Sequence, residues 1–138
     1  MRQAGALPPV DRQSKVRIMS KQVLIVDDSR VSRMLVRAFL EEKRSDWQFS
    51  EASNGQEAID LAEREPFDLV TLDVNMPGMS GLAAGERILQ IRPTARVVVL
   101  TANVQSTVRQ RAEALGMRFL QKPITEATVA RLLDLVGF

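Results

Sequence analysis

Short apolar runs alternate with segments of helical periodicity along most of the chain. Runs of this kind, rich in valine, isoleucine and leucine, are typical of strands buried on both faces of a parallel sheet. The pattern therefore predicts strands in the middle of a layered fold. The predicted strands lie at residues 23–26, 47–52, 69–72, 97–100 and 117–120, of which 47–52 has the weakest pattern.

An amphipathic segment follows each of these runs. In the first segment, apolar side chains recur at i, i+3, i+4, i+7 and i+8, which is the spacing of one helix face. We expect this face to pack on the sheet. It consists of Val31, Met34, Leu35, Ala38 and Phe39.

Residues suited to helix ends stand at the boundaries of the predicted helices. Small polar residues are placed to cap helix N-termini, and a glycine is placed to end the fourth helix in a left-handed conformation. The expected caps are Ser29, Asn54, Ser80 and Thr125, and the glycine is Gly116.

Five strand–helix units predict an α/β fold, namely a doubly wound five-stranded parallel sheet with helices on both faces. The length of 138 residues suits one domain. We expect this domain to span residues 21–138, with no separate output domain. Residues 1–20 contain Pro8-Pro9, more basic than acidic side chains and no periodic pattern, so we expect a disordered basic leader.

The composition excludes several kinds of chemistry. The chain has no histidine and no cysteine, which excludes catalytic triads that need either residue, zinc sites of the usual ligands and disulfides. The apolar runs are far shorter than the roughly 20 residues that span a bilayer, and the N-terminus lacks the apolar core of a secretory signal. We therefore expect a cytoplasmic protein that works with carboxylates, hydroxyls and ammonium groups.

Polar residues follow four of the predicted strands. Asp27 and Asp28 follow the first strand, and Asp73 follows the third. Thr101 follows the fourth strand, and Lys122 comes shortly after the fifth. Because the carboxyl ends of parallel strands meet at one edge of a sheet, we expect these side chains to share one pocket.

Three carboxylates in one pocket repel each other, by on the order of 4 kcal/mol per pair at about 4 Å. A positive partner is therefore required, and oxygen ligands with room for water and phosphate oxygens suit Mg²⁺. Lys122 supplies further positive charge. This combination is suited to phosphoryl transfer, with Asp73 as the nucleophile that forms an aspartyl phosphate.

Four stretches of the sequence resemble the receiver domain of two-component response regulators. They occur in the family's order and spacing, and they read VLIVDDS, TLDVNMPGMSG, VVVLTA and FLQKP. The resemblance covers residues 21–137. It implies a flavodoxin-like strand order of 2-1-3-4-5 with five helices.

The resemblance also implies a Mg²⁺ site built from the acidic residues. In such a site Asp28 is a direct ligand, and Asp27 acts through water. Asp73 is both a metal ligand and the phosphoacceptor. The backbone carbonyl of Asn75 is the third protein ligand.

Further residues are implied to respond to the phosphoryl group. The Thr101 hydroxyl and the Lys122 ammonium bind its oxygens, and Pro123 follows a cis peptide bond. When Thr101 moves toward the phosphoryl group it vacates space, and Phe119 matches the aromatic residue that fills this space. Phe119 and Thr101 are therefore the expected switch residues.

Ala102 and Asn103 follow the predicted switch threonine at the edge of the pocket. Asn75 and Asn103 occupy the two variable positions that flank the acceptor, and neither side chain carries charge or bulk. Neither should block water from attacking the phosphoryl group. We therefore expect a short-lived phosphoryl state, of seconds to minutes.

The resemblance implies a stand-alone receiver, a monomer or weak dimer that does not bind DNA directly. It would accept a phosphoryl group on Asp73 from a histidine kinase or a histidine phosphotransfer protein, and its only catalysis would be its own phosphorylation and dephosphorylation. It would then signal through changed protein contacts on the fourth helix, fifth strand and fifth helix. Arginines on this expected face are Arg109, Arg111, Arg118 and Arg131.

Two alternatives use the same acceptor. A phosphate sink or phosphorelay intermediate would differ from a signalling receiver only in its partners and in the lifetime of the phosphoryl group. A metal-dependent phosphohydrolase that uses Asp73 is disfavoured, because such an enzyme needs a second acid or base near the nucleophile and usually a substrate cap.

Overall fold

The computed structural model describes residues 20–138. The predicted leader, residues 1–20, lies outside this part of the chain except for Ser20. The Ser20 hydroxyl donates a hydrogen bond to the carbonyl oxygen of Asp46 (2.6 Å). The described chain thus begins in contact with the loop that precedes the second strand.

The five predicted strands form one parallel sheet in the order β2-β1-β3-β4-β5. This order confirms the doubly wound fold with the 2-1-3-4-5 arrangement. From β1 the chain continues to β2 on one side and then returns to β3 on the other side, so the strand order reverses between β1 and β3. The crevice at the carboxyl ends of β1 and β3 is the place where such folds bind ligands. The strands are β1 (Gln22–Val26), β2 (Gln48–Ala52), β3 (Leu69–Leu72), β4 (Arg96–Thr101) and β5 (Arg118–Gln121).

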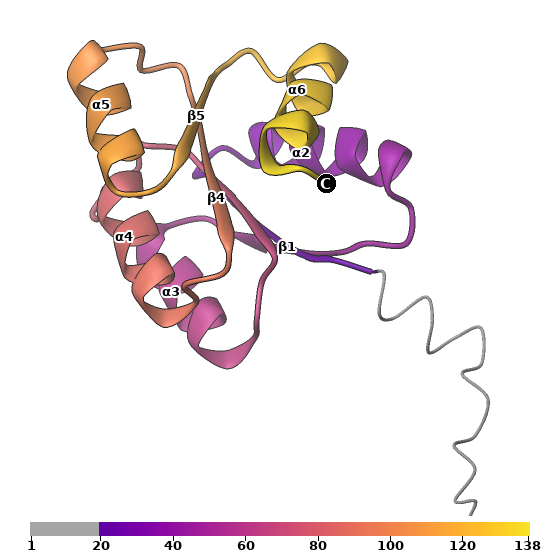
Figure 1. Ribbon diagram of the computed structural model, residues 1–138, viewed down its shortest axis with the longest axis horizontal. Helices are drawn as coiled ribbons and strands as arrows, with labels where there is room; N and C mark the ends of the chain where they lie inside the picture. The colour runs from indigo at the N-terminus through magenta and orange to yellow at the C-terminus, as the bar shows by residue number, and fades with distance from the viewer. Residues whose placement is uncertain (1–19) are drawn as a thin grey trace, which may run out of the picture.

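Five helices cover the sheet in two layers. Helices α2 and α6 lie on one face, and α3, α4 and α5 lie on the other (Figure 1). Within residues 20–138, no helix is long and apolar enough to cross a membrane. The helices are α2 (Arg30–Lys43), α3 (Gly55–Arg64), α4 (Gly81–Ile91), α5 (Ser106–Ala114) and α6 (Glu126–Val136).

The predicted helix caps are confirmed. Each of the four capping side chains accepts a hydrogen bond from a backbone N–H in the first turn of its helix, at α2, α3, α4 and α6. Gly116 follows α5 with a φ of +90°, the left-handed conformation expected of it. Helix α5 has Gln105 at its N-cap position without a side-chain cap.

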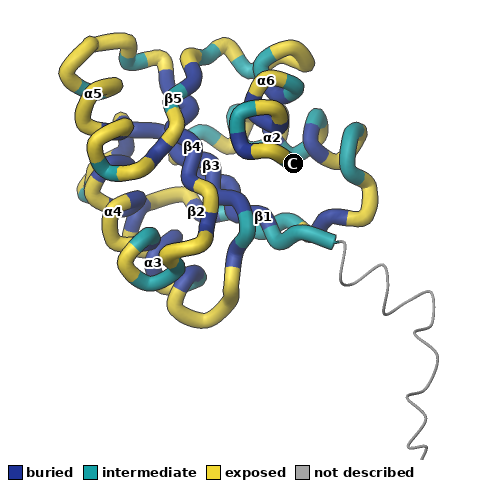
Figure 2. Tube along the Cα trace, in the orientation of Figure 1, coloured by how far each residue is buried: buried dark blue, intermediate teal, exposed yellow. Residues whose placement is uncertain are grey.

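The sheet separates two apolar cores, one under each layer of helices. Strands β1, β3 and β4 are almost wholly buried, and they form the dark centre of the molecule in Figure 2. Strand β2 is only partly buried and lies at an edge of the sheet. Its position explains why its apolar pattern is the weakest, since an edge strand has a solvated side.

The predicted apolar face of α2 is wrong except at Phe39, which is half-buried and packs against the core. Val31, Met34 and Leu35 are 66%, 56% and 40% exposed, and Ala38 is exposed as well. The helix instead buries Val36 and Leu40, which are four residues apart. An apolar stripe of α2 therefore faces solvent.

The physical reason lies on the inner side of the same helix. Ser32 and Arg33 are turned toward the carboxyl edge of the sheet, where Ser32 accepts a hydrogen bond from Lys122 and Arg33 donates to Glu51, both distant in the sequence. These polar contacts fix the rotation of α2 about its axis. Because of this rotation, the side chains of Val31, Met34 and Leu35 face solvent.

The observed rotation of α2 predicts different costs for two truncations on the same helix. Leu40→Ala, at a fully buried position, should lower the free energy of unfolding by about 2–5 kcal/mol because it leaves a cavity. Met34→Ala, at an exposed position, should change it by less than about 0.5 kcal/mol.

Urea titration followed by tryptophan fluorescence measures both changes. Trp47 is 8% exposed and meets the Phe138 ring edge-on, with 5.9 Å between centroids, so its emission reports unfolding. If Met34→Ala proved as costly as Leu40→Ala, the rotation of α2 described above would be refuted.

Candidate functional site

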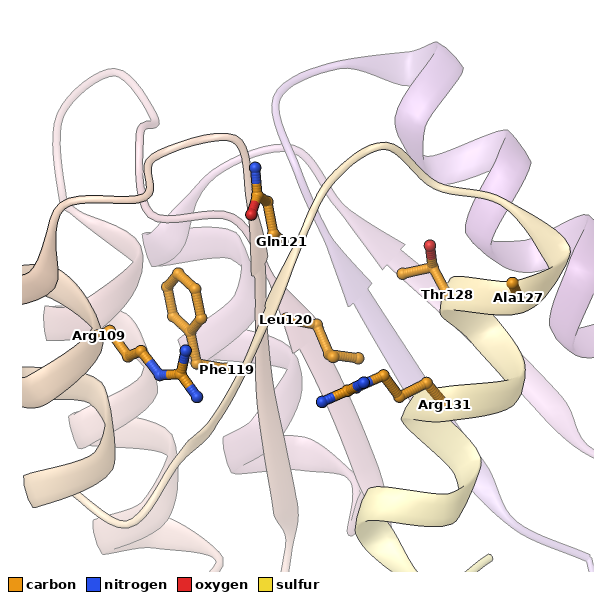
Figure 3. A pocket seen from close by; sticks show the side chains of 7 residues that line it. All are labelled: Arg109, Phe119, Leu120, Gln121, Ala127, Thr128 and Arg131. Atoms are coloured by element: carbon orange, nitrogen blue, oxygen red, sulfur yellow. The ribbon is translucent and has the colours of Figure 1, made fainter.

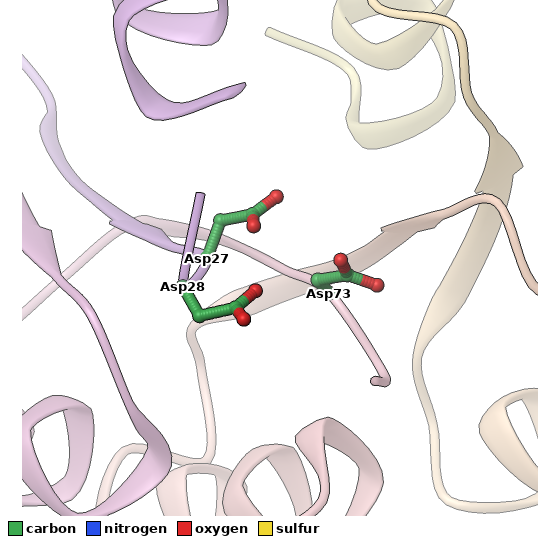
Figure 4. A group of neighbouring side chains, drawn as sticks. All are labelled: Asp27, Asp28 and Asp73. Atoms are coloured by element: carbon green, nitrogen blue, oxygen red, sulfur yellow. The ribbon is translucent and has the colours of Figure 1, made fainter. Parts of the chain in front are cut away.

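Three carboxylates converge at the carboxyl ends of two adjacent strands. Val26 of β1 is paired with Leu72 of β3, so the residues that follow these strands, Asp27 and Asp73, are brought side by side. Asp28 joins them at the next position. Oxygen atoms of the three carboxylates lie within 4.8 Å of one another, and Figure 4 shows the side chains around a shared space.

Lys122 reaches into this cluster from the end of β5. Its Nζ donates hydrogen bonds to Asp27 Oδ2 (2.9 Å), Asp73 Oδ2 (3.1 Å) and the hydroxyl oxygen of Ser32 (3.3 Å). An ammonium group has three protons to donate, and here each has an acceptor. The lysine is therefore held in one orientation between two of the three acids.

Asp27 is the most enclosed of the three acids. Its Oδ1 accepts from the Ser29 backbone N–H (2.9 Å) while its Oδ2 accepts from Lys122, so protein donors occupy both oxygens. Burial raises the pKa of the Asp27 carboxyl, although Lys122 and the Ser29 N–H act in the opposite direction. This environment suits an acid that acts on a metal ion through water rather than by direct contact.

The neighbouring acids also change the proton affinity of Lys122. Burial disfavours its charge, but hydrogen bonds and Coulomb attraction from Asp27 and Asp73 outweigh burial and raise the pKa of the ammonium group. Since the pKa lies above its ordinary value, Lys122 is protonated at neutral pH. The charge it contributes to the pocket is a fixed one.

The pocket retains a charge imbalance that a divalent cation would remove. With the three acids ionised, one ammonium leaves a net charge of −2. Asp28 is exposed, and within residues 20–138 Asp73 Oδ1 accepts only a long hydrogen bond from the Asn75 N–H (3.3 Å). A donor set made of oxygen alone, open to water on one side, fits Mg²⁺.

A glycine that the sequence reasoning did not single out supports the acceptor loop. Gly81 begins α4 and packs its backbone directly on the Asp73 carbonyl, and a Cβ at this position would overlap that oxygen. Its N–H also donates to the carbonyl of Val74 (2.9 Å). The sequence signal for this contact is a glycine directly after the Ser80 cap, because glycine permits such a close approach of two backbone segments.

Thr101 and two asparagines form the other rim of the pocket. The Thr101 side chain is buried, and its Oγ1 accepts from the Asn103 N–H (3.1 Å), which leaves the hydroxyl proton to be donated elsewhere. Asn103 Nδ2 donates to Asn75 Oδ1 (3.3 Å) and so links the loops that follow β3 and β4. Ala102, between Thr101 and Asn103, is exposed.

Phe119 lies on β5, away from the acidic cluster. It is half-buried, and the guanidinium of Arg109 lies 5.7 Å from the centre of its ring. The ring lines a groove of about 400 Å³ between α5 and α6, with Arg109 on one side and Arg131 on the other (Figure 3). The Lys122–Pro123 peptide bond is cis, as the resemblance implied.

Comparison with known proteins agrees with this arrangement. The family model of the response regulator receiver domain matches residues 23–134. The chemotaxis protein CheY of Thermotoga maritima is 34% identical over 121 residues, which cover 86% of this chain and 99% of that protein.

Solved structures of similar proteins share the fold. The chemotaxis response regulator CheY4 of Vibrio cholerae gives a TM-score of 0.75 at 29% identity, over 85% of this chain and 98% of that one. The response regulator TrrA of Thermotoga maritima, solved with Mg²⁺ and BeF, gives 0.74 at 28% identity, over 84% and 98%. The sequence match, the fold and the acidic cluster at its switch point lead to one conclusion: the chain belongs to the response regulator receiver family.

Proposed function

We propose that this receiver accepts a phosphoryl group on Asp73 from a phosphohistidine donor in a Mg²⁺-dependent reaction. The observation that carries the proposal is the Lys122 ammonium held between Asp27 and Asp73, in a pocket where three carboxylates share this one ammonium contact. A divalent cation beside Asp28 would complete the charge balance. The relative TrrA, solved with Mg²⁺ and BeF, supports this assignment.

In the proposed reaction, a carboxylate oxygen of Asp73 attacks the phosphorus atom. The new P–O bond forms as the P–N bond to the donor imidazole breaks, and the leaving nitrogen keeps the electron pair and takes up a proton. Asp28, Asp73 and the Asn75 carbonyl would hold Mg²⁺, which supplies positive charge to the phosphoryl oxygens. Lys122 offers its ammonium protons to the same oxygens.

The signal then arises from a change of charge. Phosphorylation replaces the single charge of Asp73 with roughly two and adds acceptor oxygens. The free proton of the Thr101 hydroxyl has a new acceptor there, which draws Thr101 toward the acceptor loop. Phe119 follows into the vacated space, and the groove beside Arg109 changes shape. Altered protein contacts at this groove are the proposed output.

The exposed stripe of α2 is the proposed docking surface for the phosphodonor. Val31, Met34 and Leu35 lie on the outer side of the helix whose inner residue Ser32 contacts Lys122. Val104, 57% exposed, adds an apolar side chain on the loop after β4. An apolar helix of the donor would cover this stripe and place its phosphohistidine over Asp73.

The phosphoacceptor assignment predicts a single modified residue. Incubation of the wild-type protein with phosphoramidate and Mg²⁺ should add one phosphoryl group per chain, measured by intact mass. Asp73→Asn should add none, because the amide is not a nucleophile, while Asp46→Asn at an exposed position outside the cluster should behave as wild type. An adduct on Asp73→Asn would contradict the assignment.

Binding of Mg²⁺ through Asp28 predicts that Asp28→Asn stabilises the metal-free protein but removes the stabilisation that Mg²⁺ gives to the wild type. Asp28→Asn should raise the free energy of unfolding of the metal-free protein by about 1 kcal/mol, because it relieves carboxylate repulsion. Saturating Mg²⁺ should stabilise the wild type, by about 2.7 kcal/mol at 100 times its dissociation constant, but not the variant. Urea titrations with EDTA or Mg²⁺ measure both effects, and equal stabilisation of the two proteins by Mg²⁺ would exclude Asp28 as a ligand.

The proposed docking surface predicts that one substitution slows phosphorylation by a protein donor but not by a small-molecule donor. Met34→Glu places a charge in the stripe and should slow phosphorylation by a histidine phosphotransfer protein by roughly tenfold or more. The rate with phosphoramidate, which needs no docking, should stay unchanged, and Met34→Leu should retain the protein-donor rate. Equal slowing with both donors would show damage to the site instead of lost docking.

A further inference from the structure

Arg33 on α2 makes two short contacts behind the acidic cluster. Its Nη1 donates to the main-chain carbonyl of Asp27 (2.7 Å), and its Nε donates to Glu51 Oε1 on β2 (2.9 Å). The Arg33 side chain is only 15% exposed. The guanidinium thus joins the loop after β1 to the neighbouring strand β2.

The contact with the Asp27 carbonyl constrains the backbone that leads into Asp28. The carbonyl of Asp27 and the N–H of Asp28 belong to one planar peptide unit, so fixing the carbonyl fixes the direction in which the chain enters Asp28. The N–H of Asp27 is held by the Ala52 carbonyl (3.1 Å), and its side chain is held by Ser29 and Lys122. Asp28 is exposed, so its position depends on this backbone frame.

The charge of Arg33 is not what the site uses. Glu51 accepts from Arg33 with one carboxylate oxygen and from Arg37 Nη1 with the other (3.2 Å), and Glu41 also pairs with Arg37, so two acids balance two arginines here. What Arg33 supplies is the fork of its guanidinium, whose separate N–H groups reach two acceptors in fixed directions. Lysine carries all its donors on one nitrogen at the end of a flexible stem, so it does not reproduce the rigid, separated N–H groups of the guanidinium.

We propose that Arg33 is a positioning residue of the acidic site, which holds the Asp27 carbonyl so that the Asp28 carboxylate faces Asp73 at the distance a metal ion requires. Glu51 anchors the guanidinium to β2. The proposal rests on the proposed function, since Mg²⁺ is the ion that Asp28 would bind. Outer contacts of this type commonly change metal affinity by about 10- to 100-fold when removed.

The chain offers a matched control for this residue. Arg37 also pairs with Glu51 and with Glu41, and it lies 5.8 Å from the Phe49 ring. Within residues 20–138, it is Arg33 and not Arg37 that contacts the Asp27 carbonyl. Arg33→Met and Arg37→Met therefore remove the same charge from the same face of α2. Only the first removes the contact with the acidic loop.

The test is titration of each purified, metal-free protein with Mg²⁺ alone, followed by the amide NMR signals of Asp28 and Ser29. Arg33→Met should weaken Mg²⁺ binding by roughly tenfold or more, and Arg33→Lys should not restore it. Arg37→Met should bind within about twofold of wild type. Before any metal is added, the Asp28 amide signal should be shifted in both Arg33 variants and unshifted in Arg37→Met.

A second readout separates positioning from general damage. At saturating Mg²⁺ the phosphorylation rate of Arg33→Met should return to near that of wild type, because the acceptor and Lys122 are untouched. Glu51→Gln keeps Arg33 but weakens the contact that anchors it, so its Mg²⁺ affinity should lie between those of wild type and Arg33→Met. This variant replaces Arg33→Met in the test if Arg33→Met fails to fold.

The outcomes distinguish this inference from the function on which it rests. A wild-type protein that binds no Mg²⁺ would overturn the proposed function. A wild-type protein that binds Mg²⁺ while Arg33→Met and Arg37→Met bind it equally would overturn the role of Arg33 alone. Recovery of affinity in Arg33→Lys would show that charge, not geometry, is what the residue provides.

Discussion

The Lys122 ammonium that bridges Asp27 and Asp73 is the interaction on which this molecule depends. The parallel sheet forces carboxylates from adjacent strands into contact, and one lysine from a third strand makes that contact tolerable. The compensation is incomplete, since three acids share one ammonium. This incomplete compensation is the physical basis of the proposed dependence on Mg²⁺ and of the proposed response to a phosphoryl group.

Much of the fold follows from local sequence. Strands buried on both faces have to be continuously apolar, and four helix starts carry side chains that satisfy the first backbone N–H groups. The face of α2 does not follow, because apolar residues occupy two sides of that helix. Which side is buried depends on Ser32 and Arg33, whose partners Lys122 and Glu51 are distant in the sequence. Periodicity along one helix carries no information about such partners.

The residues of the site also fall into two groups, those that the sequence indicates and those that it does not. Asp28, Asp73 and Lys122 could be found from the sequence because each stands at the end of an apolar run, and topology alone collects strand ends at one edge. Gly81 was marked only by its place directly after the Ser80 cap. Arg33 could not be assigned, because it contacts a main-chain carbonyl and no residue type indicates such a contact. The metal ligands, the movement of Thr101 and Phe119, the short phosphoryl lifetime and the cytoplasmic location remain predictions.

The placement of the single tryptophan has a practical consequence. Trp47 precedes β2, at the amino end of the sheet, where its ring meets Phe138 and the Phe138 carbonyl accepts from Arg44 (2.9 Å). The acids stand at the carboxyl end, a full strand length away. We therefore expect intrinsic emission to report global unfolding and to respond little to events at the acids. On one sample, signals from residues at the acids can follow ligand binding, while tryptophan emission follows unfolding.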